Sequence, residues 1–280
     1  MPSRAWSDTG LCHMVEAGAD EVAVRDVDGP EEMSDCVALY SRVMGLDPGD
    51  GSLNPRLLIA LQHNSGIVVG AYERRDLVGF AYGFLARDPN GSLYEYSQLA
   101  VVDAARQDHG IGRQLKHAQR ERCLAAGIMT MRWVFDPLKA RNAHFNLDVL
   151  GARLVALVPS MYGSEGFGAD RGDDTDRFVT EWDLTRRPRP ASRVPVERAW
   201  SIGETRRDHG DLLVAVPARW SGYRAQLDPT EAAATRHKLR EVFQSALLSG
   251  LIGVSCRAIN EEIAVYRFAS TGPSAVGVGQ

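Results

Sequence analysis

The sequence predicts a mixed α/β fold, and three patterns in the chain lead to that prediction. Two segments rich in β-branched and aromatic residues, 66–72 and 77–85, are separated by four polar residues and predict an antiparallel hairpin. Residues 94–135 then have the order strand, glycine turn, helix, strand, which predicts a βαβ unit with parallel neighbouring strands. Further along, an apolar stripe predicts a helix over residues 229–249.

The other elements follow from the same two periodicities. Apolar residues three or four positions apart indicate helices, and alternating or β-branched segments indicate strands. Pro30 stands near the start of the first helix, and Gly151 closes a short helix that follows the βαβ unit. The predicted helices are 31–44, 56–63, 112–126, 142–150 and 229–249, and the predicted strands are 21–27, 66–72, 77–85, 94–102, 129–135, 153–158, 177–184, 211–216, 251–257 and 263–268.

The domain organisation is predicted from shifts in composition. Residues 186–196 carry three prolines and four arginines with little apolar content, which is typical of a linker. We therefore expect a first domain over 21–185, a linker over 186–200 and a C-terminal extension over 201–270. The first 20 residues and the last ten have no clear period and are expected to be tails.

Composition excludes several classes of protein. The chain has 280 residues, of which 44% are hydrophobic and 24% charged, as in ordinary soluble globular proteins. A net charge of −4 gives no reason to expect nucleic-acid or membrane binding. The four cysteines lie far apart without a C-x-x-C pair, so we expect neither a disulfide framework nor a metal site. No membrane-spanning run and no signal peptide is evident, so a soluble, cytoplasmic protein is expected.

A Q-x-x-G-x-G turn joins the first strand of the βαβ unit to its helix. Such a turn directs several backbone N–H groups at one point beside the positive end of the helix dipole, which suits phosphate groups. The two glycines lack side chains, so an anion can approach the backbone closely. A lone G-x-G is equally compatible with a simple tight turn. The residues of this turn are Gln107, Asp108, His109, Gly110, Ile111 and Gly112.

Several motifs in a fixed order resemble those of the GNAT superfamily of acyl-CoA-dependent N-acyltransferases. The turn at 107–112 matches the pyrophosphate loop of that superfamily, and residues 142–151 (NAHFNLDVLG) match its second motif. The resemblance covers roughly residues 21–184. It is closer to one branch of predicted acetyltransferases, whose further motifs are similar to residues 133–138 (WVFDPL), 141–146 (RNAHFN), 161–163 (MYG) and 175–177 (TDR), with a C-terminal extension.

The resemblance implies a particular sheet and a co-substrate. In that superfamily a mixed, mostly antiparallel sheet with helices on both faces is splayed at a central parallel pair, here expected between residues 94–102 and 129–135. The pantetheine arm of acetyl-CoA or another acyl-CoA would lie in the splay and pair with the main chain near Leu99, Ala100 and Val101. The pyrophosphate would rest on the N–H groups of residues 108–113, where Arg113 adds a cation or is a solvated helix residue.

The second motif supplies two further candidates for cofactor binding. Asn142 either bonds the pantetheine or caps its helix, and both roles are compatible. Phe145 packs against the cofactor or the core. Many relatives place a tyrosine where this chain has Leu147, which is a real departure from the superfamily pattern. Tyr162 from the following loop is either the replacement for this general acid or a packing residue, in which case the thiolate leaves unaided.

Glu95 is the candidate general base. It lies on the first strand of the βαβ unit, where some relatives use a strand glutamate, but the register is ambiguous by one residue, which would reverse its face. It is either the base, directly or through water, or a solvated strand carboxylate. Asp136 is a second carboxylate near the strand end, where it contacts the acceptor amine or forms a turn before proline.

The function that the resemblance implies is acyl transfer to the amine of a small, amino-acid-like acceptor. Acetyl is the default acyl group; for succinyl, Arg141 or Arg132 would be available to pair with the carboxylate. The alternatives are a protein N-acyltransferase and a degenerate CoA-binding module without catalysis. The C-terminal extension is expected to cover the acceptor site or to form a homodimer.

Overall fold

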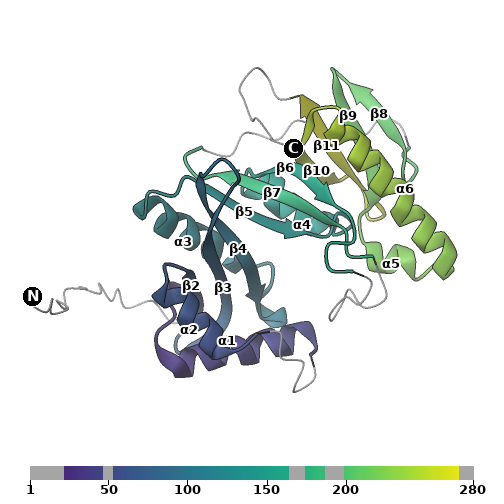
Figure 1. The fold of residues 1–280 in the computed structure, drawn as a ribbon. Coiled ribbons are helices and arrows are strands. Elements are labelled where there is room, and N and C mark those ends of the chain that lie inside the picture. Colours follow the sequence, from purple (N-terminus) through teal and green to yellow (C-terminus); the bar gives the residue numbers. More distant parts are fainter. Residues whose placement is uncertain (1–21, 47–52, 164–173, 187–198, 271–280) are drawn as a thin grey trace, which may run out of the picture.

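The computed structural model describes residues 22–46, 53–163, 174–186 and 199–270, and these residues build one mixed sheet with helices on its faces (Figure 1). The order of the 11 strands is β1-β2-β3-β4-β5-β7-β6-β10-β11-β9-β8. The strands are β1 (Val22–Asp26), β2 (Ile67–Glu73), β3 (Asp76–Arg87), β4 (Leu93–Val102), β5 (Thr130–Phe135), β6 (Arg153–Val158), β7 (Arg177–Asp183), β8 (Thr205–Asp208), β9 (Asp211–Pro217), β10 (Leu251–Ala258) and β11 (Ile263–Ser270).

The helices lie between these strands along the chain. They are α1 (Gly29–Met44), α2 (Pro55–His63), α3 (Ile111–Ala125), α4 (Ala140–His144), α5 (Trp220–Arg224) and α6 (Pro229–Leu248), with a 3₁₀ turn η1 (Ala104–Arg106) and a π-helical turn η2 (Phe145–Val149). No helix in the described ranges has the length and apolar character needed to cross a membrane.

The predicted fold class and βαβ unit are confirmed. Among the described strands β4 and β5 form the one parallel pair, and α3 connects them. Their ladder contains two residue pairs, Glu95 with Met131 and Tyr96 with Arg132. Beyond Tyr96, β4 continues as far as Val102 in register with β3 alone. The sheet is therefore split between β4 and β5.

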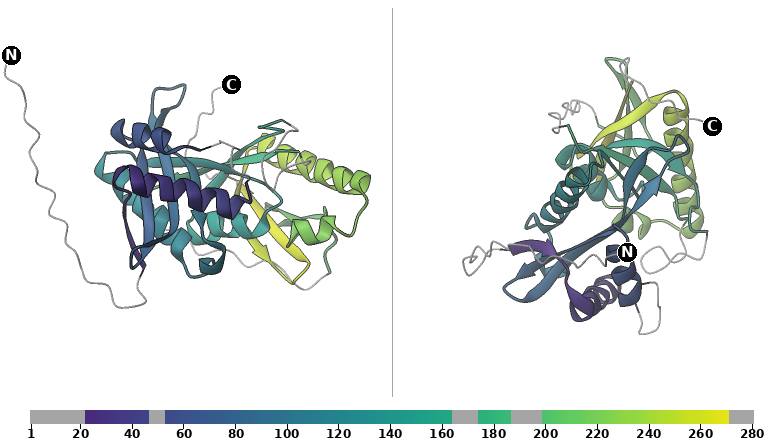
Figure 2. Two further views of the ribbon diagram at one scale, coloured as in Figure 1. Left: turned by 90° about the horizontal axis from the view of Figure 1, so that it is seen from below. Right: turned by 60° about the vertical axis from the view of Figure 1, so that its left-hand side comes forward.

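Alternation along β2 and β3 separates two cores on opposite faces of this part of the sheet. Helices lie on both of these faces (Figure 2). On one face Val68 and Phe80 pack against Met33 and Leu58 of α1 and α2. On the other face the neighbouring residues of the same strands meet α3, which buries Ile111, Leu115 and Ala118. Helices thus cover both faces, as expected.

The C-terminal extension continues the sheet of the first 185 residues. Gly253 of β10 pairs with Leu154 of β6, where a Cβ on the glycine would lie 2.5 Å from the leucine side chain. The ring centroid of Phe178 of β7 lies 4.9 Å from that of Phe243 and 5.7 Å from that of Tyr266. The extension and the first segment therefore share both a sheet and a core.

Most predicted elements agree with the structure to within a few residues, and the differences have simple causes. β8 was missed because its four residues, TRRD, carry no alternating pattern, and α5 because it has five residues. α4 begins at Ala140, two residues before the predicted start. The tails, most of the predicted linker and residues 164–173 lie outside the described ranges.

Candidate active site

The split between β4 and β5 exposes a strand edge at the centre of the sheet. Leu99, Ala100 and Val101 lie in this part of β4 and pair on one side with Tyr82, Ala81 and Phe80 of β3. No ladder to β5 is present beyond Tyr96 in the described strands. A strand edge of this kind can accept an extended chain through main-chain hydrogen bonds.

The glycine turn follows this edge directly. Gly110 is the N-cap of α3 and has φ of +80°, a left-handed conformation that L side chains rarely adopt, although a Cβ there would meet no atom within 4 Å. The first helical hydrogen bond of α3 runs from the N–H of Gln114 to the carbonyl of Gly110. The N–H groups of Ile111, Gly112 and Arg113 precede it and therefore have no partner within the helix. Arg113 itself is exposed. The turn therefore forms a concave N–H site at the end of the strand edge.

Two side chains stabilise the turn from within. Gln107 donates from Nε2 to the carbonyl of Val102 at 3.3 Å, and His109 Nδ1 lies 2.8 Å from the carbonyl of Gln107. Asp108 has φ of 70° and forms an ion pair with Arg141 of α4. Both members of that pair are mostly exposed, so its contribution to stability is small.

α4 and η2 border the turn from the other side. A Cβ on Gly112 would lie 3.8 Å from Cζ of Phe145, which places this ring beside the glycine turn. Phe145 also packs against a core cluster, and its contact with a cofactor stays a prediction. Asn142 is exposed and accepts a bond from Asn146 Nδ2 at 3.4 Å. Asn142 lies inside α4, whose N-cap is Lys139, so the alternative that Asn142 caps the helix is wrong. Leu147 is a core residue.

Glu95 is the first of the two β4 residues that pair with β5, directly before the split, and it is 2% exposed. Its Oε1 has no hydrogen-bond partner among the described residues and lies against Gly83, where a Cβ would clash with it. The side chain shares its face of β4 with Ser97 and approaches Lys116 of α3. The alternative that Glu95 is a solvated carboxylate is therefore wrong, and its role as a base stays a prediction.

Lys116 is a buried cation that sequence reasoning missed. Its Nζ donates to Ser97 Oγ at 2.7 Å and lies 4.0 Å from the centre of the Trp133 ring, and Ser97 donates to Gln119 Oε1 at 2.9 Å. Its place at helical spacing among the apolar residues Leu115, Ala118 and Cys123 of α3 was the available signal. Ser97 and Gln119 are likewise buried, so β4 is bonded to α3 just where it leaves β5.

Burial shifts the pKa values of Glu95 and Lys116 toward neutral pH. Burial raises the pKa of Glu95 to about 8, against an opposing attraction from Lys116. Burial lowers the pKa of Lys116 to about 7, against the attraction of Glu95. A carboxyl group with a pKa near neutrality beside a split strand pair is a feature of functional sites as well as of strained cores.

Tyrosines gather on the opposite face of β4. Tyr96 alternates with Glu95, and its hydroxyl shares a hydrogen bond with Tyr162. Burial and this bond raise the pKa of Tyr96 to about 12, and burial raises that of Tyr82 to about 12 with Tyr40 and Tyr162 nearby. Tyr162 is 46% exposed, so it is not a core packing residue. The two predicted catalytic residues, Glu95 and Tyr162, thus lie on opposite faces of β4.

Residues 174–177 hold the turn that carries Tyr162. Thr175 Oγ1 accepts from the N–H of Tyr162 and donates to the carbonyl of Gly163, both at 2.8 Å. Asp176 Oδ1 accepts from the N–H of Ser160 at 3.0 Å, and its Oδ2 accepts from Arg240 Nε of α6 at 2.8 Å. The T-D-R motif of the sequence therefore positions Tyr162, and the extension supports the motif.

Other candidates from the sequence have structural partners. Asp136 accepts from the N–H of Leu138 at 2.8 Å and lies 3.5 Å from Arg236, as a turn residue would. Arg132 donates to Glu181 at 2.9 Å and covers the Tyr94 ring. In the described part of the chain no group of three or more His, Cys, Asp or Glu side chains is arranged to hold a metal ion.

Comparison with known proteins yields similar solved structures, whereas no family model and no curated protein matches the sequence. One is a putative acetyltransferase of the GNAT family from Desulfovibrio desulfuricans, with 17% identity, a TM-score of 0.47, and coverage of 59% of this chain and 99% of that one. Another is aminoglycoside 6'-acetyltransferase type Ii, with 18% identity, a TM-score of 0.45, and coverage of 60% and 99%. The ribosomal-protein-S18-alanine N-acetyltransferase from Escherichia coli has 12% identity, a TM-score of 0.46, and coverage of 64% and 100%.

Proposed function

We propose that this protein transfers an acyl group from acyl-CoA to the amine of a small molecule. The observation that carries the proposal is the open edge of β4, which ends directly in the glycine turn at the start of α3. An extended pantetheine arm suits the first feature and a pyrophosphate suits the second. Acetyl is the acyl group we propose by default, and an amino-acid-like molecule is the proposed acceptor.

The chemistry requires a neutral amine held against a thioester. A lysine-like amine with a pKa of about 10.4 loses about 4–5 kcal/mol to deprotonation at pH 7, whereas an α-amine near 8 loses about 1–2 kcal/mol. Holding the two reactants together can lower the barrier by roughly 7–11 kcal/mol. Main-chain N–H groups at the edge of β4 would stabilise the oxyanion of the tetrahedral intermediate.

Two groups are proposed for proton transfer. We assign Tyr162, which is partly exposed beside the other tyrosines, to the acceptor side as the acid that protonates the departing thiolate. Burial raises the pKa of Glu95 to about 8, so its ionised form is basic enough to accept a proton near neutral pH. Because Glu95 is 2% exposed and lies on the face of β4 opposite Tyr162, we propose that it receives the proton of the amine through water at the split between β4 and β5.

The test begins with binding. Thermal unfolding is followed with acetyl-CoA, succinyl-CoA and longer acyl-CoAs, and turnover is then screened on amines by detection of free thiol. Stabilisation by an acyl-CoA is expected, since a ligand that binds the native state alone raises its stability. If no CoA derivative stabilises the protein, the proposal is wrong.

A matched pair of glycine variants localises that binding. Gly110→Glu places a carboxylate at the proposed pyrophosphate site and should abolish stabilisation by CoA. Gly127→Glu is the control, because Gly127 follows the other end of α3, has φ of +77°, and also has no atom within 4 Å of a Cβ. Equal loss of CoA binding in both variants would show that backbone strain, and not the turn, is responsible.

Leu147 favours a second candidate, a CoA-binding module without catalysis. It is buried in the core where relatives with the resembling motif have a tyrosine. Stabilisation by acyl-CoA without turnover on any amine would support this candidate. Turnover that disappears in Tyr162→Phe would exclude it.

A further inference from the structure

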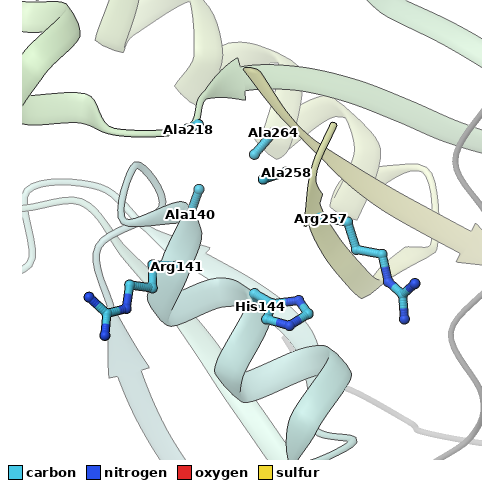
Figure 3. Close-up of a pocket in the computed structure, with 7 residues that line it drawn as sticks. All are labelled: Ala140, Arg141, His144, Ala218, Arg257, Ala258 and Ala264. Atoms are coloured by element: carbon cyan, nitrogen blue, oxygen red, sulfur yellow. The ribbon is translucent and has the colours of Figure 1, made fainter. Parts of the chain in front are cut away.

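A cavity of about 460 Å³ lies between α4 and the C-terminal extension, outside the strand edge described above (Figure 3). Arg141 and His144 of α4 line it on one side and Arg257 of β10 on the other. Four alanines complete the lining, and no carboxylate side chain is among the residues that line it. The combination of arginines with small side chains indicates room for an anionic group.

Arg257 is hydrogen-bonded through the Nε atom of its guanidinium. Its Nε donates to Asp148 Oδ1 at 2.9 Å, and its side chain remains 41% exposed. Asp148 is itself fixed, since it accepts from Ser255 Oγ at 2.8 Å and from the N–H of Cys256 at 2.9 Å. These bonds orient the guanidinium and leave its two terminal nitrogens without a partner among the described residues. They can form a bidentate contact with a phosphate.

Arg141 links the cavity to the glycine turn. Its guanidinium forms an ion pair with Asp108, which belongs to the turn that we propose holds the pyrophosphate. One arginine side chain therefore spans from the lining of the cavity to that turn. The cavity also lies on the same face as α3, because Phe145 of η2, which follows α4, packs against the core cluster that contains Cys123 of α3. Tyr162 lies on the other face, so the cavity is on the donor side of the sheet.

We infer that this cavity binds a phosphomonoester, and that acyl-CoA supplies it through the 3′-phosphate of its nucleoside end. The inference rests on the proposed function for the source of the phosphate. CoA carries that phosphate one ribose away from its pyrophosphate, which matches an arginine-lined cavity one side chain away from the glycine turn. Arg257 thereby gives the C-terminal extension a direct part in binding the donor.

Calorimetric titration with CoA and with dephospho-CoA, which lacks the 3′-phosphate, tests the inference. Wild-type protein should bind CoA at least about tenfold more tightly than dephospho-CoA, since a charged hydrogen-bonded contact contributes that much. In Arg257→Gln the affinity for CoA should fall to that for dephospho-CoA, whose own affinity should not change. Arg257→Lys should restore part of the preference because it keeps the charge.

Two further variants protect the test. Ala258→Glu places a carboxylate at the exposed end of β10 in the cavity without removing a bond to Asp148, and it should also lower the affinity for CoA alone. Arg207→Gln makes the same change of charge as Arg257→Gln on β8, away from the cavity lining, and should keep the wild-type preference. A preference that persists in both Arg257→Gln and Ala258→Glu would overturn the assignment to the 3′-phosphate.

A second arm identifies the source of the phosphate. Inorganic phosphate is titrated into the CoA-saturated protein, and no binding that depends on Arg257 is expected. If CoA and dephospho-CoA bind alike while phosphate binds in a manner that depends on Arg257, the cavity takes a free phosphorylated ligand. If neither ligand depends on Arg257, the phosphomonoester site is refuted. Failure of all CoA derivatives to bind the wild type instead refutes the proposed function.

Discussion

The buried carboxyl of Glu95 makes the stability of the protein depend on pH in a way that one substitution should remove. Glu95→Gln keeps the size and the hydrogen-bonding capacity of the side chain but cannot ionise. Because burial raises the pKa of Glu95 to about 8, the native protein holds this proton over a pH range in which the unfolded chain releases it. The contribution of Glu95 to stability is therefore fully present below pH 4.5 and is lost as pH rises toward 8.

The magnitude follows from that interval. Between the usual value of 4.5 and about 8, each pH unit corresponds to about 1.4 kcal/mol, and the whole interval to about 5 kcal/mol. The free energy of unfolding of Glu95→Gln minus that of the wild type should rise by about 1.4 kcal/mol per pH unit from pH 5 to 7.5. Above pH 8 the difference should level off.

Lys116 changes this difference in the same direction. Burial lowers the pKa of Lys116 to about 7, and the attraction of Glu95 opposes that change. In Glu95→Gln this attraction is absent, so the pKa of Lys116 should fall further. The native variant then releases the lysine proton at a lower pH than the native wild type does. Its stability therefore begins to rise with pH at a lower pH than that of the wild type.

Urea denaturation at pH 5, 6, 7 and 8, followed by tryptophan fluorescence, measures the effect. Glu121→Gln is the matched control, since Glu121 lies on α3 but is exposed. If the difference between Glu95→Gln and the wild type stays constant over this range, the reasoning about buried ionisation is refuted. The same variant reports on catalysis, because loss of a base should lower kcat mainly for strongly basic amines.

Three further predictions concern residues around Glu95 and Tyr162. Tyr162→Phe should lower kcat by about 100-fold or more with unchanged affinity for acyl-CoA, and unchanged kcat would exclude it as the acid. Arg240→Met should lower kcat about tenfold, because Arg240 holds Asp176, and Arg240→Lys should restore part of this loss. Both kcat and the affinity for acyl-CoA are measured, and an equal fall in affinity would contradict this. Gly83→Ala should lower the free energy of unfolding by roughly 1–3 kcal/mol, because its Cβ would lie 2.7 Å from the carbonyl of Tyr96; an unchanged urea midpoint would contradict it.

The donor half of the candidate site could be predicted because its signals are local in the chain. A β-branched strand, a glycine turn and a helix follow one another within about 30 residues, and that order alone implies parallel strands. The parallel pairing of β4 with β5, which α3 connects, confirms that prediction, whereas the cofactor contacts of Gly110 and Phe145 stay predictions. Local sequence, however, gave no indication that β4 and β5 share two residue pairs before they separate.

The faces of β4 could not be predicted because they depend on register. The register between β3 and β4 shifts between Tyr82 and Phe84, where Gly83 of β3 faces two residues of β4, Ser97 and Gln98, so that β4 carries the bulge. Residues on the two sides of a bulge do not keep a simple alternation, so counting back from Val101 or Val102 gives conflicting faces for Glu95. Its partner Lys116 lies 21 positions along the chain on another element, and polar pairs of this kind leave no periodic signal.

The contacts of the C-terminal extension were the least predictable, and they explain what the extension contributes. Arg257 bonds Asp148 across 109 positions, and Tyr266 donates to the carbonyl of Pro137 across 129. Arg240 bonds Asp176 across 64 positions. The first two contacts hold the region of α4 and η2 on the donor side, and the third holds the turn of Tyr162 on the other face. A change that loosens the extension should therefore affect donor binding through Arg257 and turnover through Arg240, and these two effects should be separable by single substitutions.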